Sequence, residues 1–408
     1  MSGAIYMDNH ATTKPDPRVV EAMMPFLTTE YGNSSSRTHA FGWRAEEAVT
    51  RARGQVACLL NADPKEIYFT SGATESNNLA LLGVMRSYAH KGDHAITGAT
   101  EHPSVLDVLK ELADRGARVT VLPVDRHGRI DPDAVRAAIT DRTVLVSLMA
   151  ANNEVGTLHP LAEIGAVCKE RGVLFHTDAA QATGRIALDV QSMGIDLLSI
   201  SAHKIHGPKG AGALYVRRKN PRVILEPVQR GGGQERGLRS GTLNVPGIVG
   251  LGAALEIARA EMPAEMRRVA ALRDRLKKEI LARLEDVVLN GHPEERLPNN
   301  LNLSFAYVEG EALVLALEGV AVSSGSACTS EKREPSHVLK AMGVSDDMAQ
   351  TSIRFGLGRF NTEQEVDEVA GRVAAAVARL REISPLYQAA RGGGDRTSGS
   401  YYSAHKGV

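Results

Sequence analysis

Apolar, β-branched runs alternate with longer helical patterns between about residue 60 and residue 220, and this alternation constrains the fold most strongly. Strands separated by helices indicate a largely parallel sheet with helices on both faces, because each parallel connection crosses over the sheet. The intervening LAEIGAVCKERG has apolar residues at helical spacing and ends in Gly172, which suits a helix terminus. We therefore predict an α/β fold whose large domain contains a mostly parallel seven-stranded sheet. The predicted strands are residues 66–70, 94–99, 118–124, 143–150, 173–177, 196–201 and 212–218.

The pattern changes after a glycine-rich segment at residues 229–247. The charged stretch at residues 257–284 predicts a long helix that carries the chain out of the first domain. Short strands then mix with helices, as in a smaller α+β domain. The predicted large domain covers residues 16–258, the small domain covers residues 1–15 and 259–387, and a flexible polar tail covers residues 388–408.

Composition excludes several classes of protein. The 408 residues include 48 Lys and Arg and 48 Asp and Glu, so no overall electrostatic field favours nucleic acid or an anionic membrane, although a local basic patch can exist. No apolar stretch reaches the roughly 18 residues that span a bilayer, and the N-terminal residues do not resemble a secretory signal. Three cysteines without CxxC spacing disfavour a disulfide framework or a structural zinc site. We expect a globular protein of the reducing cytoplasm.

Two polar residues follow successive predicted strands, at the position where an α/β sheet binds its ligands. Asp178 directly follows residues 173–177, and Lys204 follows residues 196–201. A desolvated amine can act as nucleophile and base, while a buried carboxylate requires a partner such as a protonated pyridine. Pyridoxal phosphate is the first cofactor to consider, with Lys204 as its Schiff-base lysine and Asp178 on its ring nitrogen. The alternatives are a surface lysine and an aspartate that caps a turn.

The turn after a third predicted strand, residues 66–70, is suited to bind an anion. In TSGATESNN the chain turns from a strand into a helix whose first amide groups have no partner within the helix. Ser71, Gly72 and Ala73 make this turn. Thr74 faces outward with the free amide groups, and Ser201 and His203 flank Lys204, so these three side chains are candidates for holding a phosphate. Ordinary capping of the helix by its own side chains is the alternative. The absence of GxxxxGK[ST] and GxGxxG disfavours a Walker loop or a dinucleotide site.

Nine segments carry a resemblance to a known family. They are SGATESNN, TEHPSV, ANNEVGT, HTDAAQATG, SAHKIHGPKG, GGGQERGLRSGT, AYVEGE, SSGSACTS and SIRFGLGRF. In combination they resemble the cysteine desulfurase family, in its NifS/IscS branch of class V aminotransferase-like, fold-type I pyridoxal-phosphate enzymes. The resemblance runs from about residue 5 to residue 387.

The resemblance implies a role for each matching residue. Besides Lys204 and Asp178, it implies Gln181 on the ring oxygen and His102 stacked on the ring with a proton-transfer role. Asn153 and Arg354 are implied to hold the substrate carboxylate. Alternatives remain: His102 makes one backbone hydrogen bond at a helix start, and Arg354 forms a structural salt bridge. The residues implied to bind the cofactor are Ala73, Thr74, His102, Asn153, Asp178, Gln181, Ser201, His203, Lys204 and, from the second subunit of a homodimer, Thr242.

Cys328 determines the reaction that the resemblance implies. It lies in a Gly/Ser-rich loop at about residues 323–334, where small residues suit a mobile segment, and Lys332 and Arg333 are candidates for favouring its thiolate. The thiolate attacks the sulfur of cofactor-bound L-cysteine, giving alanine and a persulfide on Cys328. The implied acceptor is an iron–sulfur scaffold protein or a sulfur carrier used in tRNA thiolation. Cys58 and Cys168 fall within helical patterns, and we expect them to be small buried residues.

Three other functions are alternatives. A selenocysteine lyase or an aminotransferase could use the same fold, and a sulfur-relay or assembly scaffold could retain it without catalysis. A metal hydrolase using His102, His176, His203 and His206 lacks compact ligand spacing such as HExxH, and no metal is expected. His10, His206, His337 and the EKR after CTS depart from the family's usual pattern. They leave the identity of the acceptor open.

Overall fold

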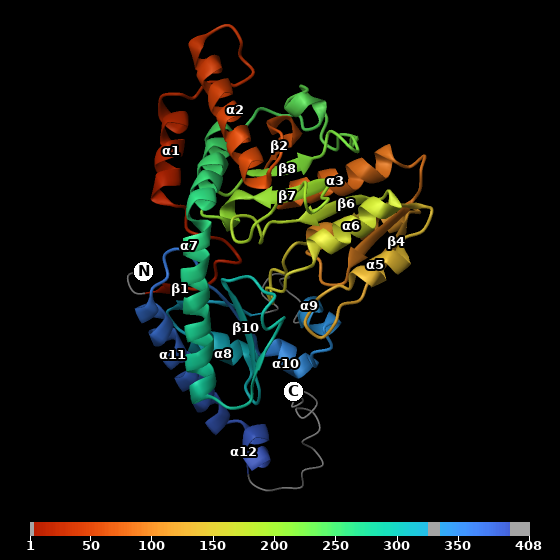
Figure 1. The fold of residues 1–408 in the computed structure, drawn as a ribbon. Coiled ribbons are helices and arrows are strands. Elements are labelled where there is room, and N and C mark those ends of the chain that lie inside the picture. The colour runs from red at the N-terminus through yellow and green to blue at the C-terminus, as the bar shows by residue number, and fades with distance from the viewer. Residues whose placement is uncertain (1–3, 325–334, 392–408) are drawn as a thin grey trace. The chain divides into compact units, whose positions relative to one another are not determined.

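A computed structural model describes residues 4–324 and 335–391 of the chain. These residues divide into two compact units (Figure 1). Of the described residues, the larger unit comprises residues 10–153 and 157–265, and the smaller unit comprises residues 4–9, 154–156, 266–324 and 335–391. Within the described ranges, no helix has both the length and the apolar character that crossing a bilayer requires.

The larger unit contains a seven-stranded sheet in the order β2-β8-β7-β6-β5-β3-β4. Strand β8 is antiparallel to both of its neighbours, while the pairs from β7 to β4 are all parallel, so the predicted mostly parallel sheet is confirmed. The strands are β2 (Ile67–Thr70), β3 (His94–Gly98), β4 (Arg118–Leu122), β5 (Thr143–Ser147), β6 (Leu174–Asp178), β7 (Leu197–Ser201) and β8 (Gly212–Val216).

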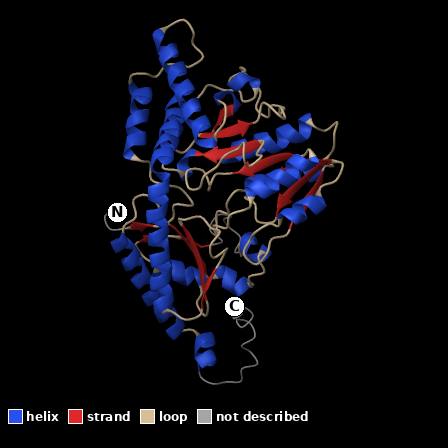
Figure 2. Ribbon diagram, viewed as in Figure 1, coloured by secondary structure: helices blue, strands red, loops and turns tan. Residues whose placement is uncertain are grey.

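Helices cover this sheet from two sides (Figures 1 and 2). In Figure 1, α3 lies above the sheet and α5 and α6 lie below it. Strands β3, β5, β6, β7 and β8 are buried at every residue, which is why they read as continuous apolar runs. The helices of this unit are α1 (Pro17–Thr28), α2 (Ala40–Leu60), α3 (Ala73–Ser87), α4 (Pro103–Asp114), α5 (Pro132–Ala138) and α6 (Leu161–Arg171), with 3₁₀ turns at Pro64–Glu66, Ala202–Lys204 and Glu235–Gly237.

The strand directions place several loops at one edge of the sheet. Because β8 is antiparallel to both β2 and β7, β2 runs in the same direction as β7 and the remaining parallel strands. The carboxyl ends of β2, β3, β5, β6 and β7 therefore meet at the same edge. This is the edge at which open α/β sheets bind ligands.

The predicted strands each match an observed strand to within a few residues, and α6 ends at Gly172 with a left-handed φ of 67°, as predicted. The long helix differs, because α7 (Val245–Arg283) begins about a dozen residues before the predicted start at residue 257. A Cβ added to Gly252 would lie 2.8 Å from the Ala52 backbone of α2, and one added to Gly250 would lie 2.6 Å from the Met23 sulfur. These glycines lie between the glycine-rich segment at residues 229–247 and the predicted helix start at residue 257, and they permit close packing inside a helix.

The smaller unit is built on a four-stranded antiparallel sheet in the order β12-β13-β10-β9. Strand β10 is buried at each of its six residues, and β13 at each of its five. Its remaining elements include the two-stranded parallel pair of β1 and β11. The elements are β1 (Ile5–Tyr6), β9 (Val287–Leu289), β10 (Asn300–Phe305), β11 (Val320–Ala321), β12 (Ser323–Ser324), β13 (Ser352–Gly356), α8 (Gly310–Ala316), α9 (His337–Ala341), α10 (Asp346–Gln350), α11 (Glu363–Glu382) and α12 (Pro385–Arg391).

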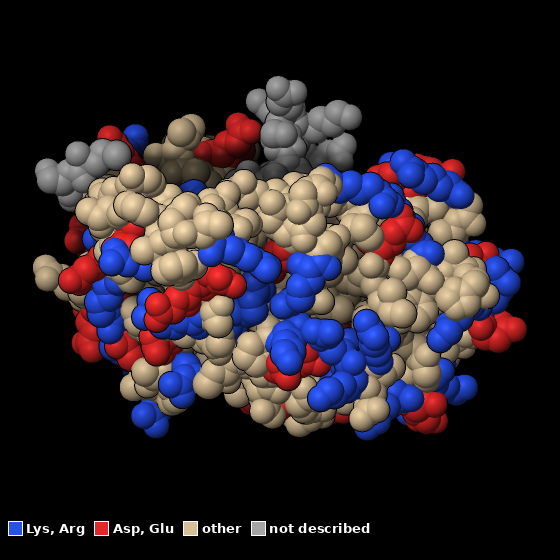
Figure 3. All heavy atoms as spheres, turned by 90° about the horizontal axis from the view of Figure 1, so that it is seen from above, with Lys and Arg blue, Asp and Glu red and all other residues tan. Residues whose placement is uncertain are grey.

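Figure 3 shows Lys and Arg side chains gathered near the middle of the face seen from above, so the balanced net charge does not preclude a local basic region. Cys168 is buried in α6 as expected, but the expectation for Cys58 is wrong, because its thiol is exposed on α2. The buried face of α2 contains Ala45, Val49, Ala52 and Val56, and residue 58 falls outside that helical stripe.

Candidate cofactor site

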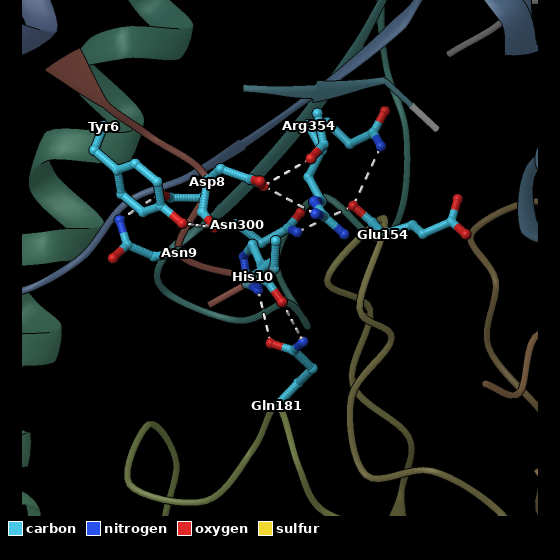
Figure 4. A network of polar contacts seen from close by, with 12 residues as sticks. Tyr6, Asp8, Asn9, His10, Glu154, Gln181, Asn300 and Arg354 are labelled. Atoms are coloured by element: carbon cyan, nitrogen blue, oxygen red, sulfur yellow. Dashed lines mark hydrogen bonds and ion pairs between the residues drawn. The ribbon is translucent and has the colours of Figure 1, made fainter. Parts of the chain in front are cut away.

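Lys204 and Gln181 both donate hydrogen bonds to the carbonyl oxygen of His10, within the larger unit. Lys204 lies in the 3₁₀ turn that follows β7, and its Nζ donates hydrogen bonds to the carbonyl oxygens of His10 and Ala11, the latter at 2.8 Å. The Gln181 amide nitrogen donates to the same His10 oxygen at 3.0 Å, and its Oε1 accepts a hydrogen bond from His10 Nδ1 at 2.9 Å (Figure 4). Because an amide oxygen only accepts, His10 carries a proton on Nδ1. The loop at residues 10–13 thus fixes both predicted side chains.

Asp178 ends strand β6, one strand away from Lys204, and is 6% exposed. Its Oδ1 accepts from the Ala180 amide at 2.9 Å, and its Oδ2 accepts from Asn77 Nδ2 at 2.7 Å. The first contact is the turn-capping bond that the sequence analysis considered as an alternative, but it occupies only one oxygen. No Lys or Arg of the described ranges forms an ion pair with this carboxylate.

A buried carboxylate without a cationic partner costs several kcal/mol, so this site requires a positive group. A carboxylate has about four acceptor positions, of which two are used here, and a protonated pyridine nitrogen can take another. The Asp178 environment therefore fits the ring of pyridoxal phosphate.

His102 is joined to Asp178 through two bridging side chains. Asn77 Nδ2 donates to Ser104 Oγ at 2.8 Å as well as to Asp178, and Ser104 Oγ lies 2.8 Å from His102 Nδ1. His102 also caps α4, because its Nδ1 accepts the Ser104 amide at 3.1 Å, as the alternative for this residue proposed. An Nδ1 that accepts leaves the proton of the neutral ring on Nε2. His102 is therefore oriented by α4 and by the same network that holds Asp178.

The start of α3 fits a phosphate group. Its N-cap, Gly72, has no side chain, and Ser76 Oγ bonds to Thr70 Oγ1 at 2.8 Å, while Glu75 accepts from the Ser71 amide at 2.8 Å just before the helix. Ser201 Oγ lies beside this turn, 3.7 Å from the position that a Cβ of Gly72 would occupy. Unpaired amides at a helix start and nearby hydroxyl groups bind anions well. Ala73 and Thr74 thus follow β2, and Ser201 ends β7, with only β8 between these two strands in the sheet.

His203 lies next to Lys204 and contacts Thr12 Oγ1 through its Nδ1 at 3.2 Å. Burial, together with the neighbouring charges of Lys204 and Lys209, lowers the pKa of His203 to about 4. A neutral imidazole can still donate one hydrogen bond to a phosphate oxygen.

The structure places the remaining predicted residues as follows. Asn153 lies in the segment between β5 and α6, and Thr242 is exposed in the segment before α7. Arg354 belongs to the smaller unit, where its Nη2 pairs with Asp8 Oδ1 at 2.9 Å, so the salt bridge considered for it is present (Figure 4). Cys328, Lys332 and Arg333 lie outside the described residues.

Sequence reasoning missed three residues that organise this site, namely Asn77, Ser104 and His10. Asn77 and Ser104 stand inside motifs that carried the family resemblance, and Asn77 follows Ala73 by about one helical turn. His10 was noted only as a departure from the family pattern. Only the fold shows that these three side chains contact Asp178, His102 and Gln181.

A metal centre finds no support in the part of the chain that the structure describes, where no three His, Cys, Asp or Glu side chains could together hold a metal ion. His176 and His206, considered as ligands for a metal hydrolase, bond instead to serine hydroxyls and to the Lys14 carbonyl oxygen, respectively.

Comparison with known proteins gives the family. A family model described as aminotransferase class-V matches residues 5–369. The chain belongs to the class-V aminotransferase family. Enzymes of this family use pyridoxal phosphate, which confirms the predicted cofactor.

Relatives within the family are similar over almost the whole chain. The chain is 58% identical over 401 residues to a cysteine desulfurase IscS of Anaeromyxobacter dehalogenans (strain 2CP-C), covering 98% of this chain and 99% of that protein. It is 56% identical over 394 residues to a cysteine desulfurase of Mus musculus, covering 97% and 86%. A solved NifS-like protein superposes with a TM-score of 0.86 at 39% identity, covering 92% of this chain and 100% of the other. The resemblance to the NifS/IscS branch is confirmed.

Proposed function

We propose that the protein is a cysteine desulfurase, which removes sulfur from L-cysteine and leaves L-alanine and a persulfide on Cys328. The observation that carries this proposal is the placement of Asp178 and Lys204 at the ends of the neighbouring parallel strands β6 and β7. The relatives named cysteine desulfurase support the choice of reaction within the family. A structural neighbour described as SspA in complex with cysteine, with a TM-score of 0.78 and 37% identity, supports the choice of substrate.

The cofactor-facing residues have separate tasks. Asp178 holds a negative charge at the end of β6, Gln181 and His10 fix one side of the site, and the start of α3 with Ser201 and His203 offers hydrogen bonds to a phosphate. Bound pyridoxal phosphate withdraws electrons from the α-carbon of the joined substrate. Lys204 Nζ, held at the site by two carbonyl oxygens, is positioned to accept and return a proton. The neutral ring of His102 carries its proton on Nε2, and from there it is suited to donate this proton toward the substrate.

The sulfur step balances without an added oxidant. The Cys328 thiolate attacks the substrate Sγ, the bond between Sγ and Cβ breaks, and Cβ takes the electron pair and then a proton. Cys328 carries the sulfur as a persulfide, and the substrate leaves as alanine. Of the other cysteines, Cys168 is a poor nucleophile, because burial and the charge of Asp196 raise the pKa of its thiol to about 12.

Three further assignments belong to this proposal. Asn153 and Arg354 hold the substrate carboxylate, with Arg354 exchanging part of its pairing with Asp8. Residues 259–387, together with residues 1–15, act as a small domain that carries the loop of Cys328, and residues 16–258 act as the cofactor-binding domain. The persulfide passes to an iron–sulfur scaffold or to a sulfur carrier for tRNA thiolation in the cytoplasm.

A homodimer is also part of the proposal, with Thr242 of the second subunit reaching the phosphate. An apolar surface on α1 and α2 supports it, because monomeric proteins rarely expose large contiguous apolar patches. The α1 and α2 segments lie side by side in Figure 1, and the rings of Tyr31 and Phe41 are 5.4 Å apart. Exposed apolar side chains of this surface are Val20, Met24, Leu27, Tyr31, Phe41 and Trp43. Leu27→Asp should convert the dimer to a monomer in analytical ultracentrifugation, and an unchanged dimer would exclude this surface.

The activity is tested with purified protein supplied with pyridoxal phosphate and L-cysteine. We expect equal amounts of alanine and protein persulfide in the absence of reductant, and neither product from Cys328→Ala. Cys58→Ala is the matched control, because Cys58 is an exposed cysteine on α2, and it should keep full activity. Turnover of selenocysteine that survives Cys328→Ala would instead favour the selenocysteine lyase alternative, and amino-group transfer to a keto acid would favour an aminotransferase.

A further inference from the structure

A chain of hydrogen-bonded polar side chains crosses the centre of the large sheet. His176 of β6 contacts Ser147 Oγ of β5 through Nδ1 at 2.8 Å and Ser199 Oγ of β7 through Nε2 at 3.0 Å. Thr97 of β3 extends the chain by donating to the Ser147 carbonyl oxygen at 3.0 Å. All four residues are fully buried, in strands that are otherwise mainly apolar. Buried polar networks are costly when any member loses its partner, so this one requires an explanation.

The network lies directly next to Asp178. His176 precedes Asp178 by two residues on β6, so both side chains project from the same face of the sheet. Ser199 is the register partner of Asp178 on β7. Backbone bonds continue the connection, since Ala150 N donates to Asp178 O at 2.9 Å and Ala179 N donates to Ser199 O at 3.0 Å. The imidazole of His176 thus neighbours the Asp178 carboxylate on the same face of the sheet.

Burial favours the neutral forms of two titratable groups near Asp178. Burial lowers the pKa of His176 to about 4, with the nearby Asp178 charge raising it only in part. Glu101, also fully buried, accepts the Met149 amide at 2.6 Å, and burial together with the Asp178 charge raises its pKa. A charged imidazole at this position would neutralise the Asp178 carboxylate, whereas a neutral one leaves that charge available.

We infer that His176 is a positioning residue for the cofactor, acting through Asp178. Its neutral ring, held between Ser147 and Ser199, fixes the end of β6 and leaves the Asp178 charge for the ring nitrogen of the cofactor. The inference rests on the proposed use of pyridoxal phosphate, and it extends the cofactor site to a residue that does not touch the cofactor.

The same sheet provides a matched control. His94, the first residue of β3, contacts Thr143 Oγ1 at 2.7 Å and Thr120 Oγ1 at 2.9 Å, so it bridges the neighbouring strands β5 and β4 in the same manner. It lies at the amino ends of the parallel strands, away from Asp178. A purely structural role for buried bridging histidines predicts equal consequences for His94 and His176. A role in positioning predicts that only His176 affects the cofactor.

The experiment measures the dissociation constant of pyridoxal phosphate from full-length protein, together with the thermal stability of the cofactor-free form. Asparagine at position 176 is neutral and can keep the bond to Ser147 but not the bond to Ser199. We expect His176→Asn to weaken cofactor binding about ten-fold, the factor that matches loss of one or two neutral hydrogen bonds. His94→Asn should lower the melting temperature by a similar amount and leave the dissociation constant unchanged.

A double-mutant cycle tests the link through Asp178. In an Asp178→Asn background, His176→Asn should cause no additional loss of cofactor affinity. A loss that persists in that background, or an affinity within two-fold of wild type for His176→Asn alone, would overturn the inference. If His176→Asn does not fold, Ser199→Ala removes the same bond to the ring and should weaken binding to a similar extent, with the same dependence on Asp178. Failure of wild-type protein to bind pyridoxal phosphate would refute the proposed function instead.

Discussion

Replacing Asp178 with asparagine distinguishes an effect on cofactor binding from an effect on the stability of the fold. The substitution keeps the shape of the side chain and removes its charge. In the cofactor-free protein, one hydrogen bond, from Ala180 or Asn77, loses its acceptor. Asn77 can turn its amide to restore a bond, because its Oδ1 is buried without a hydrogen-bond partner. The variant also no longer buries a carboxylate that has no cationic partner.

These effects oppose each other in the cofactor-free protein. Loss of a charge-assisted hydrogen bond costs about 1.5–3 kcal/mol, and relief of the buried charge recovers a similar amount. We therefore expect the free energy of unfolding to change by less than about 1 kcal/mol. In the bound state, truncating one partner of a buried charge pair costs about 3 kcal/mol, which corresponds to about 100-fold weaker cofactor binding.

The assay is titration of cofactor-free protein with pyridoxal phosphate, followed by visible absorbance, beside urea unfolding of the same samples. Asp114, exposed at the end of α4 opposite to His102, offers a control, because Asp114→Asn removes a charge away from the site. A dissociation constant for Asp178→Asn within three-fold of wild type would refute the reasoning. Equal losses of stability and affinity would show that Asp178 acts only on the fold.

The remaining predictions concern covalent attachment, pH and packing. Lys204→Ala should abolish retention of the cofactor after borohydride reduction and denaturation, while circular dichroism stays that of the wild type; retained label would contradict the assignment. Burial lowers the pKa of His159 to about 4 in the folded protein. On acidification the unfolded chain therefore takes up a proton at this histidine before the folded protein does, and the free energy of unfolding should fall between pH 7 and pH 5. His159→Asn should reduce that fall by about 1.5–2 kcal/mol in urea titrations, and an identical fall would exclude this cause. Gly252→Ala should cost about 1–3 kcal/mol through its contact with Ala52, whereas Gly54→Ala, with nothing within 4 Å, should stabilise α2 by about 0.5–1 kcal/mol, as calorimetry would show.

The sheet and the cofactor-binding strand ends could be predicted from sequence because they depend on local periodicity. Continuous apolar runs identified the buried strands, and the order of strands and helices implied parallel pairing, which brings Asp178 and Lys204 to one edge. Residues that act through tertiary contacts could not be found in this way. Asn77 and Ser104 reach Asp178 and His102 only because α3 packs beside α4, and no sequence spacing encodes that contact.

Two other differences have simple physical causes. A helical pattern does not reveal which side of α2 faces the core, and so Cys58 was wrongly expected to be buried. Gly250 and Gly252 favour a loop by intrinsic propensity, but close helix packing outweighs that preference in α7. Asp8, the partner of Arg354, lies 346 residues away in sequence, and only the fold of the smaller unit shows their salt bridge.

A single-turnover reaction tests the central claim most directly. Cofactor-loaded protein is mixed with one equivalent of L-cysteine, and the peptide containing Cys328 is analysed by mass spectrometry while alanine is measured. The proposed function predicts one added sulfur atom on Cys328 for each alanine formed, with Cys58 and Cys168 unmodified. Alanine formation with the added sulfur on another cysteine, or with none on the protein, would contradict it.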